Sequence, residues 1–310
     1  MRVGLDIGGT KTAALLMDDH GTIQHESVRP TGYGATEVIA TAVAAAHELA
    51  AVAGMATSGF SSVGVGVPGV VTATSGTVSH AVNLGLENLE LGSILADRLG
   101  TRVHVENDVN AAAVGVYHLL AEPATHSMAY LNLGTGLAAG LVLEGRIWRG
   151  SRGTAGEIGH IPVDPDGPLC ACGQRGCLEL VASGSGIARM WPTESPRPME
   201  ALHAAAINGD SVAADVFTRF TQNVAASVRV LVLSVDVDKV VIGGGMSSLG
   251  APLIDAVATV LDAWAVESPF LDSLQLASRV ELLPDGYSAA AVGAALVGGE
   301  SPTELQPTCS

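Results

Sequence analysis

One order of predicted elements occurs twice along this chain, and it constrains the fold more than any other feature. Around residues 1–30 and again around 128–147, an apolar strand runs through a Gly-rich turn into a second strand. Further strands then alternate with Ala-rich or amphipathic helices, which is the pattern of an α/β protein. Two successive units of this kind indicate a duplication. We therefore expect an α/β fold built from two similar halves.

The strands and helices of each half are predicted from apolar periodicity and from turn residues. In the first half we expect strands near 3–9, 12–17, 22–27, 61–69 and 102–107, and helices near 36–53, 89–100 and 108–120. In the second half we expect strands near 128–136, 138–147, 238–245 and 279–285, and helices between about 211 and 234, at 252–266 and at 288–298. Residues 145–183 are rich in Gly, Pro and Cys and fit neither period. Such an insertion is expected to carry a site.

The composition is that of a folded, acidic protein. The chain has 310 residues, of which 48% are hydrophobic and 15% charged, enough for two lobes with apolar cores. Its formal charge of −16 opposes binding to nucleic acid or to an anionic membrane, and we expect neither as a partner. A neutral sugar is compatible with this charge. A nucleotide would require local backbone amides, lysine or a metal ion.

The sequence predicts neither a membrane span nor a secretory signal. The apolar stretch Val38–Ala56 is interrupted by Thr41, His47 and Glu48, which makes it a poor span. Asp6 falls inside what would be the hydrophobic part of a signal peptide. We therefore expect a cytoplasmic protein.

Three Gly-rich turns each follow an apolar strand. They are Gly8-Gly9-Thr10-Lys11, Gly134-Thr135-Gly136 and Gly243-Gly244-Gly245. Glycine lets backbone N–H groups approach an anion, and threonine and lysine add a hydroxyl and a positive charge. Hairpin turns use the same residues, so a single turn would be weak support. Three of them at strand ends favour phosphate binding.

Asp6 ends the first strand, beside the first of these turns. A carboxylate there repels phosphate unless a cation lies between them, so we interpret Asp6 as a magnesium ligand, directly or through water. The alternative is an aspartate that only forms the turn. Two other nucleotide motifs are excluded: GxxxxGK[ST] is absent, and Gly134–Gly140 runs into a predicted strand instead of the helix that a dinucleotide fingerprint needs.

Asp108 lies at a predicted strand-to-helix junction, directly after Asn107. One interpretation is an ordinary helix cap. The other is a carboxylate directed at a substrate hydroxyl, which it orients and from which it takes the proton during phosphoryl transfer.

The most specific pattern in the sequence is H-x9-C-x-C-x4-C, formed by His160, Cys170, Cys172 and Cys177. Three thiolates and one imidazole can complete a tetrahedral zinc site with no open position, which is the structural type. In a cytosolic protein, clustered cysteines favour a metal over a disulfide. The alternatives are three buried thiols beside an unrelated histidine, or an iron–sulfur cluster, which normally takes four cysteines; the fourth cysteine, Cys309, lies near the chain end.

Two acids are tethered to this cluster. Glu157 lies three residues before His160, and Glu179 lies two residues after Cys177. Rigidly held carboxylates can accept hydrogen bonds from sugar hydroxyls, and the second ring nitrogen of His160 can join them. The alternative is a pair of solvated loop acids.

Seven segments, in order along the chain, resemble motifs of the ROK (repressor, open reading frame, kinase) group in the actin-like, sugar-kinase and heat-shock-ATPase superfamily. They are LDIGGTK (5–11), GVPG (66–69), END (106–108), LGTG (133–136), GEIGH (156–160), CACGQRGCLE (170–179) and IGGG (242–245). Two departures bear on function. Ala138 and Ala139 stand where many relatives have glycines, which puts the geometry of the nucleotide loop in question. The loop 83–92, which helps to shape the sugar pocket in relatives, lacks the aromatic residue that often follows its Asn-Leu-Gly.

The resemblance implies an actin-like, ribonuclease-H-like fold of two lobes, 1–121 and 122–310. A zinc-binding segment at 156–179 and a C-terminal helix near 286–298 that packs back on the first lobe are expected with it. The implied substrates are MgATP and a hexose, and zinc is structural. By role, the implied site residues are Asp108 as base; Asn107, Asp108, Glu157, His160 and Glu179 for the sugar; Asp6, Gly8, Gly9, Thr10, Lys11, Gly134, Thr135, Gly136, Gly243, Gly244 and Gly245 for the nucleotide; and His160, Cys170, Cys172 and Cys177 for zinc.

The expected function is ATP-dependent phosphorylation of the 6-hydroxyl of glucose or a similar hexose. The alternatives are an N-acetylmannosamine or N-acetylglucosamine kinase, and a catalytically silent sugar-binding protein of the same fold. Repressors of the family carry a helix-turn-helix domain ahead of the first strand, whereas here that strand begins at residue 2, so we do not expect a DNA-binding regulator. A homodimer or higher homo-oligomer is expected from the resemblance alone.

Overall fold

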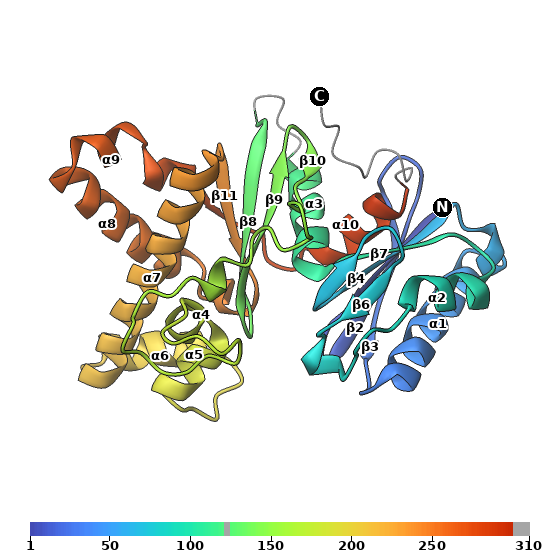
Figure 1. Cartoon of the computed structure of the whole chain (residues 1–310), viewed down its shortest axis with the longest axis horizontal. Coiled ribbons are helices and arrows are strands. Elements are labelled where there is room, and N and C mark those ends of the chain that lie inside the picture. Colours follow the sequence, from blue (N-terminus) through green and yellow to red (C-terminus); the bar gives the residue numbers. More distant parts are fainter. Residues whose placement is uncertain (121–124, 300–310) are drawn as a thin grey trace. The chain divides into compact units, whose positions relative to one another are not determined.

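The computed structural model describes residues 1–120 and 125–299, and it divides into two compact units (Figure 1). As far as they are described, the first unit comprises Met1–Ala121, Arg146–Ala155 and Ser288–Ser310, and the second comprises Glu122–Gly145 and Gly156–Tyr287. Residues 146–155 therefore lie with the first unit, although the predicted lobe boundary assigns them to 122–310. The physical reason is that β10 (Arg146–Ile147) contacts helix α3 and that Arg149 pairs with Glu106, both within the first unit.

The first unit contains a five-stranded sheet of order β3-β2-β1-β4-β7. The strands are β1 (Arg2–Ile7), β2 (Lys11–Met17), β3 (Ile23–Pro30), β4 (Ser62–Val67) and β7 (Val103–Asn107). β1 is antiparallel to β2, with Arg2 opposite Met17, and parallel to β4, with Arg2 opposite Ser62. A separate hairpin, β5 (Val70–Thr72) and β6 (Thr77–Ser79), was not predicted.

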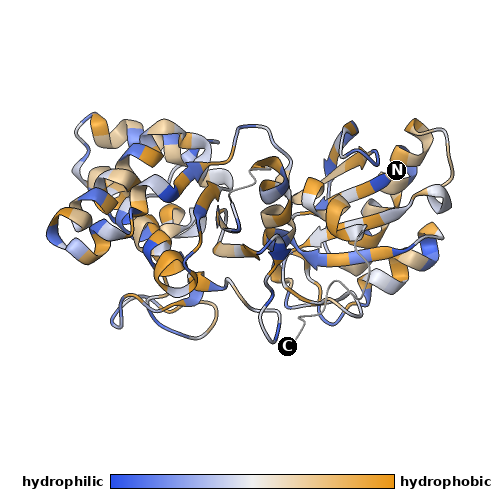
Figure 2. Cartoon of the chain, turned by 90° about the horizontal axis from the view of Figure 1, so that it is seen from above, coloured by the Kyte–Doolittle hydropathy of each residue, from blue (hydrophilic) through white to orange (hydrophobic). Residues whose placement is uncertain are grey.

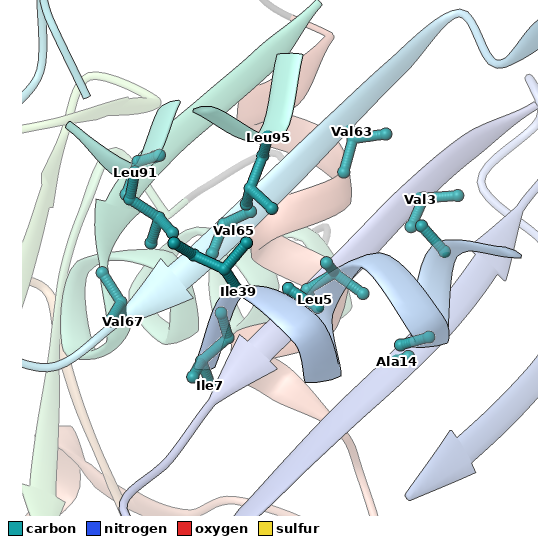
Figure 3. Packing of buried hydrophobic residues seen from close by; sticks show 14 of the residues in the cluster. Val3, Leu5, Ile7, Ala14, Ile39, Val63, Val65, Val67, Leu91 and Leu95 are labelled. Carbon is teal, nitrogen blue, oxygen red and sulfur yellow. The ribbon is translucent and has the colours of Figure 1, made fainter. Parts of the chain in front are cut away.

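One face of this sheet is apolar because alternate strand residues point the same way. Val63, Val65 and Val67 are fully buried there. Helices α1 (Ala35–Val52) and α2 (Leu91–Leu99) supply the other half of this core. Ile39 and Leu95, from these two helices, belong to one apolar cluster with Val65 (Figure 3).

The other face is lined by glycines, which let α3 (Asp108–Leu120) and α10 (Ala289–Gly298) approach closely. A Cβ at Gly64 would lie 1.7 Å from the carbonyl oxygen of Ala294 in α10, and one at Gly4 would lie 1.9 Å from that of Ala291. α10 and α3 meet in the same manner, since a Cβ at Gly293 would lie 1.7 Å from the carbonyl oxygen of Ala111. α3, which begins with Asp108, is thus held by direct backbone packing.

We expect Gly64→Ala to lower the free energy of unfolding by about 3 kcal/mol, because the added methyl group overlaps helix backbone that must move as a body. Urea denaturation of the purified variant measures this. Gly59→Ala is the matched control, because the nearest atoms to its new methyl group are those of Met55 at ordinary contact distance, 3.5 Å or more; we expect a change within about 0.5 kcal/mol. Equal unfolding midpoints for the two variants would contradict the close packing.

The second unit repeats the topology of the first. Its strands are β8 (Ser127–Leu133), β9 (Leu137–Leu143), β11 (Lys239–Gly243) and β12 (Val280–Leu282). With β10 paired to β9, the five-stranded sheet has the order β10-β9-β8-β11-β12, which matches β3-β2-β1-β4-β7. Each begins with an antiparallel hairpin and continues through parallel pairs. This repetition of strand order supports the predicted duplication.

Six helices accompany this second sheet in the described part of the chain. They are α4 (Glu179–Ala182), α5 (Gly184–Met190), α6 (Pro198–Ile207), α7 (Ser211–Val235), α8 (Ala251–Glu267) and α9 (Pro269–Ser273). α7 begins at the capping residue Asp210, whose side chain accepts hydrogen bonds from the N–H groups of Val212 and Ala213. Hydrophobic and hydrophilic residues are interleaved along the helices, as amphipathic helices require (Figure 2).

The predicted strands and helices are present in both units, with ends shifted by a few residues. The region 211–234 is one helix of 25 residues, α7. Helices α4, α5, α6 and α9 were not predicted from the sequence.

α1 is, by length and composition alone, apolar enough to cross a membrane, and it is the single such helix among the described residues. Seven of its residues, including Val38, Ala42 and Leu49, are buried. They pack in the core of the first unit, which accounts for the apolar composition.

Candidate functional site

The first Gly-rich turn joins β1 to β2 and is fixed by hydrogen bonds. The N–H of Gly8 donates to the carbonyl oxygen of Lys11 at 2.9 Å, which closes the turn. The hydroxyl of Thr31, on the adjoining strand end, donates to the carbonyl oxygen of Gly8 at 2.7 Å and lies 2.9 Å from the hydroxyl of Thr12. Both threonines are fully buried. The buried threonines therefore hold the turn, while Gly9 remains exposed.

Asn83 is a neighbour of this turn that was not predicted from the sequence. It lies in the 3₁₀ segment Val82–Leu84, and its Cβ would be 3.3 Å from a Cβ at Gly9. A polar side chain in an exposed loop is typical of a site residue, but no short-range pattern relates Asn83 to Gly9, more than seventy positions earlier.

Asp6 and Asp108 lie close enough to influence one another. Burial and, to a smaller extent, the negative charge of Asp108 raise the pKa of Asp6 from 3.8 to about 7, against an opposing effect of Lys11. The two carboxylates repel one another, and a hard divalent cation would offset this repulsion by its positive charge. The role of Asp6 as a magnesium ligand stays a prediction.

This shift predicts a pH dependence of stability in the absence of a divalent cation. Because the folded-state pKa of Asp6 exceeds its unfolded value, folding favours the neutral carboxyl group over the charged one. The stability that Asp6 contributes is therefore fully present below pH 3.8 and is lost as the pH rises through about 7. Between pH 5 and pH 9, we expect the wild type to lose about 2–3 kcal/mol of unfolding free energy more than Asp6→Asn does. Urea titrations at each pH measure it, and parallel curves for the two proteins would refute it. Added Mg²⁺ is expected to reduce the difference.

Asn107 and Asp108 occupy the corner between β7 and α3. The side-chain oxygen of Asn107 accepts hydrogen bonds from the N–H groups of Val109 and Asn110 at 2.9 and 3.1 Å, so Asn107 caps the helix. Its amide nitrogen donates to the carbonyl oxygen of Gly69 at 3.1 Å. The cap is therefore Asn107, and Asp108 is the first helical residue, with its carboxylate accepting from the Val109 N–H at 2.9 Å.

The second Gly-rich turn joins β8 to β9 and is held by the start of α5. The N–H of Gly184 donates to the carbonyl oxygen of Gly134 at 2.8 Å, and the N–H of Ser185 donates to that of Thr135 at 3.1 Å. Ser183, which is fully buried, caps α5 through the N–H of Gly186. The segment 183–186 therefore supports this turn. This support was not predicted, although the Ser-Gly repeat at 183–186 is visible in the sequence.

Ala138 and Ala139 do not disturb this turn. Both lie in β9, opposite Asn132 and Leu131, and neither is among the described residues with positive φ. The N–H of Ala139 donates to the carbonyl oxygen of Gly156 at 2.8 Å. Alanine is accommodated because the backbone at these positions is extended.

The third Gly-rich segment lies at the end of β11. Gly244 has φ of 87°, and a Cβ there would lie 2.5 Å from the side-chain oxygen of Asn132. A Cβ at Gly243 would lie 2.6 Å from the Tyr130 ring. These two glycines are therefore required by packing against β8. Gly245 has no neighbour within 4 Å of such a Cβ.

Gly245 borders a pocket of about 480 Å³ in the second unit. Pro196, Arg197, Pro198, Glu200, Met246, Ser248 and Asp285 complete its lining. This volume suits a nucleoside-sized ligand. The nucleotide contact expected at Gly245 stays a prediction.

The four predicted metal ligands are brought together in the second unit. One donor atom each from His160, Cys170, Cys172 and Cys177 lies within 4.8 Å of the others. A tetrahedral zinc ion places two sulfur ligands about 3.8 Å apart and a sulfur and a nitrogen about 3.6 Å apart. The Sγ atoms of Cys172 and Cys177 are 3.6 Å apart, and Sγ of Cys170 is 3.8 Å from Nδ1 of His160. The donor set and its spacing therefore fit zinc.

Glycines make this cluster possible. Gly159 lies in the 3₁₀ segment Ile158–His160, and a Cβ there would lie 2.0 Å from the carbonyl oxygen of Leu137. Gly176 has φ of 63°, and its Cβ would lie 1.6 Å from the carbonyl oxygen of Asp164. No other residue type fits these positions, which return the chain to Cys177.

The three thiols differ in acidity. Burial raises the pKa of Cys170 to about 12 and raises that of Cys177. Hydrogen bonds from the backbone and side chain of Gln174 lower the pKa of Cys172 to about 6. Cys172 is thus the most acidic of the three and offers a thiolate at neutral pH, and a divalent cation supplies the charge that favours the other two thiolates.

Glu179 joins the cluster to the second Gly-rich turn. Its Oε1 lies 3.1 Å from Sγ of Cys170 and 3.7 Å from Nδ1 of His160. Its Oε2 lies 3.3 Å from where a Cβ of Gly136 would be. Glu157 lies three residues before His160 and is exposed. The structure therefore groups His160 and Glu179 directly and places Glu157 on the connected loop.

The chain is similar to known proteins over nearly its whole length. The model of the ROK family matches residues 2–298. Glucokinase from Streptomyces coelicolor is 33% identical over 291 residues, which cover 86% of this chain and 88% of that protein. N-acetylmannosamine kinase from Pasteurella multocida is 32% identical over 257 residues, 81% of this chain and 84% of that protein.

A solved structure shows the same architecture. The ROK family glucokinase from Streptomyces griseus, in complex with glucose and AMPPNP, has a TM-score of 0.78 and 30% sequence identity; the match covers 96% of this chain and 98% of that chain. The match of the family model and the sequence relatives agree with it. The chain belongs to the ROK family.

Proposed function

We propose that this protein is an ATP-dependent hexose kinase that transfers the γ-phosphoryl group of ATP to the 6-hydroxyl of glucose or a similar hexose. The observation that carries the proposal is its similarity to a glucokinase, 33% identical over 86% of this chain. The similar structure from Streptomyces griseus holds glucose and a non-hydrolysable ATP analogue. Both lines support a sugar kinase as the general class.

Asp108 acts as the base in this proposal. Its carboxylate orients the sugar hydroxyl and takes up its proton as the new P–O bond forms. Because the transition state of phosphoryl transfer is loose, orientation contributes more than early proton removal. The Asn107 amide N–H donates to a neighbouring sugar hydroxyl, and the helix cap keeps it beside Asp108.

The sugar is further held by Glu157, His160 and Glu179. If His160 binds zinc through Nδ1, its Nε2 remains for a sugar hydroxyl. His160 with Cys170, Cys172 and Cys177 would hold the zinc ion, which supplies rigidity to this loop and, with four protein ligands, no water activation.

The nucleotide is bound by the three Gly-rich turns. Backbone N–H groups and Thr10, Lys11 and Thr135 contact phosphate oxygens, and the pocket beside Gly245 takes the adenosine. A magnesium ion bound with ATP supplies positive charge to the phosphate oxygens, and Asp6 would hold it. Cytoplasmic localisation and a homo-oligomeric state stay predictions.

A second candidate is an N-acetylhexosamine kinase. The 32% identity to the kinase from Pasteurella multocida favours it. The same carboxylates serve either substrate, since both candidates are sugars with a ring of hydroxyl groups. Space beside the 2-position of the sugar distinguishes the two.

ADP release measured with purified protein, MgATP and a panel of sugars tests the proposal. The panel contains glucose, mannose, allose, fructose, N-acetylmannosamine and N-acetylglucosamine, with Asp108→Asn as the blank, and NMR of the product identifies the phosphorylated hydroxyl. We expect kcat/KM to be highest for glucose. A higher value for an N-acetylhexosamine selects the second candidate, and no sugar-dependent ADP release indicates a catalytically silent protein.

A further inference from the structure

A buried ion pair lies directly behind the corner that carries Asp108. Glu106 is 3% exposed and Arg149 is 14% exposed. Nε of Arg149 donates to Oε2 of Glu106 at 2.7 Å, and an Nη atom of the same guanidinium lies 2.6 Å from that oxygen. Burying two charges is expensive unless the geometry is good and other hydrogen bonds complete it.

The other oxygen of Glu106 is bonded to the corner itself. Oε1 accepts from the backbone N–H of Asn107 at 3.0 Å and from the side-chain amide of Asn110 at 3.0 Å. These two residues flank Asp108 in sequence, one in front of the helix and one in its first turn. A continuous chain of bonds thus runs from Arg149 through Glu106 to both sides of Asp108.

Arg149 comes from a segment with an unusual course. Residues 146–155 belong to the first unit, while the chain before and after them belongs to the second. The segment is followed directly by Gly156 and Glu157. Arg149 is therefore the side chain by which this crossing segment is attached to the end of β7, 43 positions earlier in sequence.

We propose that Arg149 is a positioning residue for Asp108, acting through Glu106 to hold the β7–α3 corner in the orientation that phosphoryl transfer needs. The inference rests on the proposed function, because it assigns Asp108 the role of base. A displacement of about 1 Å of a catalytic group can cost about 10²-fold in rate. The planar guanidinium donates one hydrogen bond through Nε and places Nη2 in ion-pair contact with the same carboxylate oxygen, an arrangement that the single ammonium of lysine cannot reproduce.

The test compares Arg149→Met with Arg149→Lys and with a control, Arg279→Met. Arg279 also donates to an aspartate, Asp236, at 2.9 Å and to a backbone carbonyl oxygen, but it lies in the second unit. Circular dichroism and zinc content measure the folded fraction, so that kcat is expressed per folded molecule.

For Arg149→Met we expect kcat to fall about 10²-fold while KM for sugar and for MgATP changes less than about threefold. Arg149→Lys should recover part of the loss, and millimolar guanidinium should raise kcat of Arg149→Ala. Arg279→Met should keep the kcat of the wild type. An unchanged kcat in Arg149→Met, or an equal loss in Arg279→Met, would overturn the inference.

Hydrogen exchange provides a readout that is independent of activity. We expect the amides of Asn107, Val109 and Asn110 to exchange at least about tenfold faster in Arg149→Met than in the wild type, because their acceptors lose their support. Unchanged exchange at these amides overturns the positioning role even if the wild type phosphorylates no sugar. An inactive wild type with faster exchange in the variant instead refutes the proposed function and leaves the support of the corner by Arg149 standing.

Discussion

Replacing Asp108 by asparagine is expected to lower kcat by about 10²–10⁴-fold, with KM for hexose and MgATP changed by less than about threefold. Asparagine keeps the size of the side chain and an oxygen that can accept from the Val109 N–H, so helix α3 retains its first turn. What it loses is the ability to take the proton of the sugar hydroxyl. Steady-state kinetics of ADP release measure the effect. A variant with the kcat of the wild type would remove Asp108 as the base.

The same substitution makes a second, structural prediction. Because the charge of Asp108 is one of the causes that raise the pKa of Asp6, Asp108→Asn should lower that pKa from about 7. Carbon-13 NMR of the aspartate carboxyl groups can follow the titration. Asp97→Asn is the matched control, since Asp97 is an exposed aspartate on α2 in the same unit, and it should change neither kcat nor the titration of Asp6.

Loss of the metal site is the second change with a large expected effect. We expect about one zinc ion per chain in the purified protein, and none in Cys177→Ser. Cys177 is fully buried, its neighbour Gly176 has φ of 63°, and helix α4 begins two residues later. Without the metal, nothing of comparable strength closes this loop, so the free energy of unfolding should fall by at least ~5 kcal/mol.

Activity should be lost together with the metal, because Glu179 lies 3.1 Å from Sγ of Cys170 and depends on the same loop for its position. Elemental analysis, urea denaturation and sugar-dependent ADP release measure the three consequences. Cys309→Ser serves as the thiol control; Cys309 lies outside the described residues. Pure, active protein with far less than one zinc ion per chain would show that the cluster has no structural role.

Local patterns were enough to predict most of the elements and the composition of the candidate site. The spacing of Cys170, Cys172 and Cys177 after His160 predicted a cluster, and the structure brings these four side chains together. The strand that follows Gly136 excluded a dinucleotide fingerprint, and β9 confirms that strand. These predictions succeeded because the interactions involved are short in sequence, so that spacing alone determines which donors can meet.

Other features could not be deduced from spacing. The sequence left open whether Asp108 caps the helix, and the corner hydrogen bonds show that Asn107 is the cap and Asp108 the first helical residue. The sequence suggested one phosphate-binding turn at Gly243-Gly244-Gly245. In the structure, Gly243 and Gly244 are required by packing against β8, and Gly245 borders a pocket in the second unit.

The sequence by itself determined the order of most strands and helices, the duplication and the types of chemical group in the candidate site. Periodicity and motif spacing carry that information because neighbouring residues share one local geometry. Only the tertiary structure decided that residues 146–155 lie with the first unit and that Arg149 supports Glu106 behind Asp108. Such a pairing depends on how distant strands and helices pack, and a buried charge selects its partner by three-dimensional proximity, which no local pattern encodes.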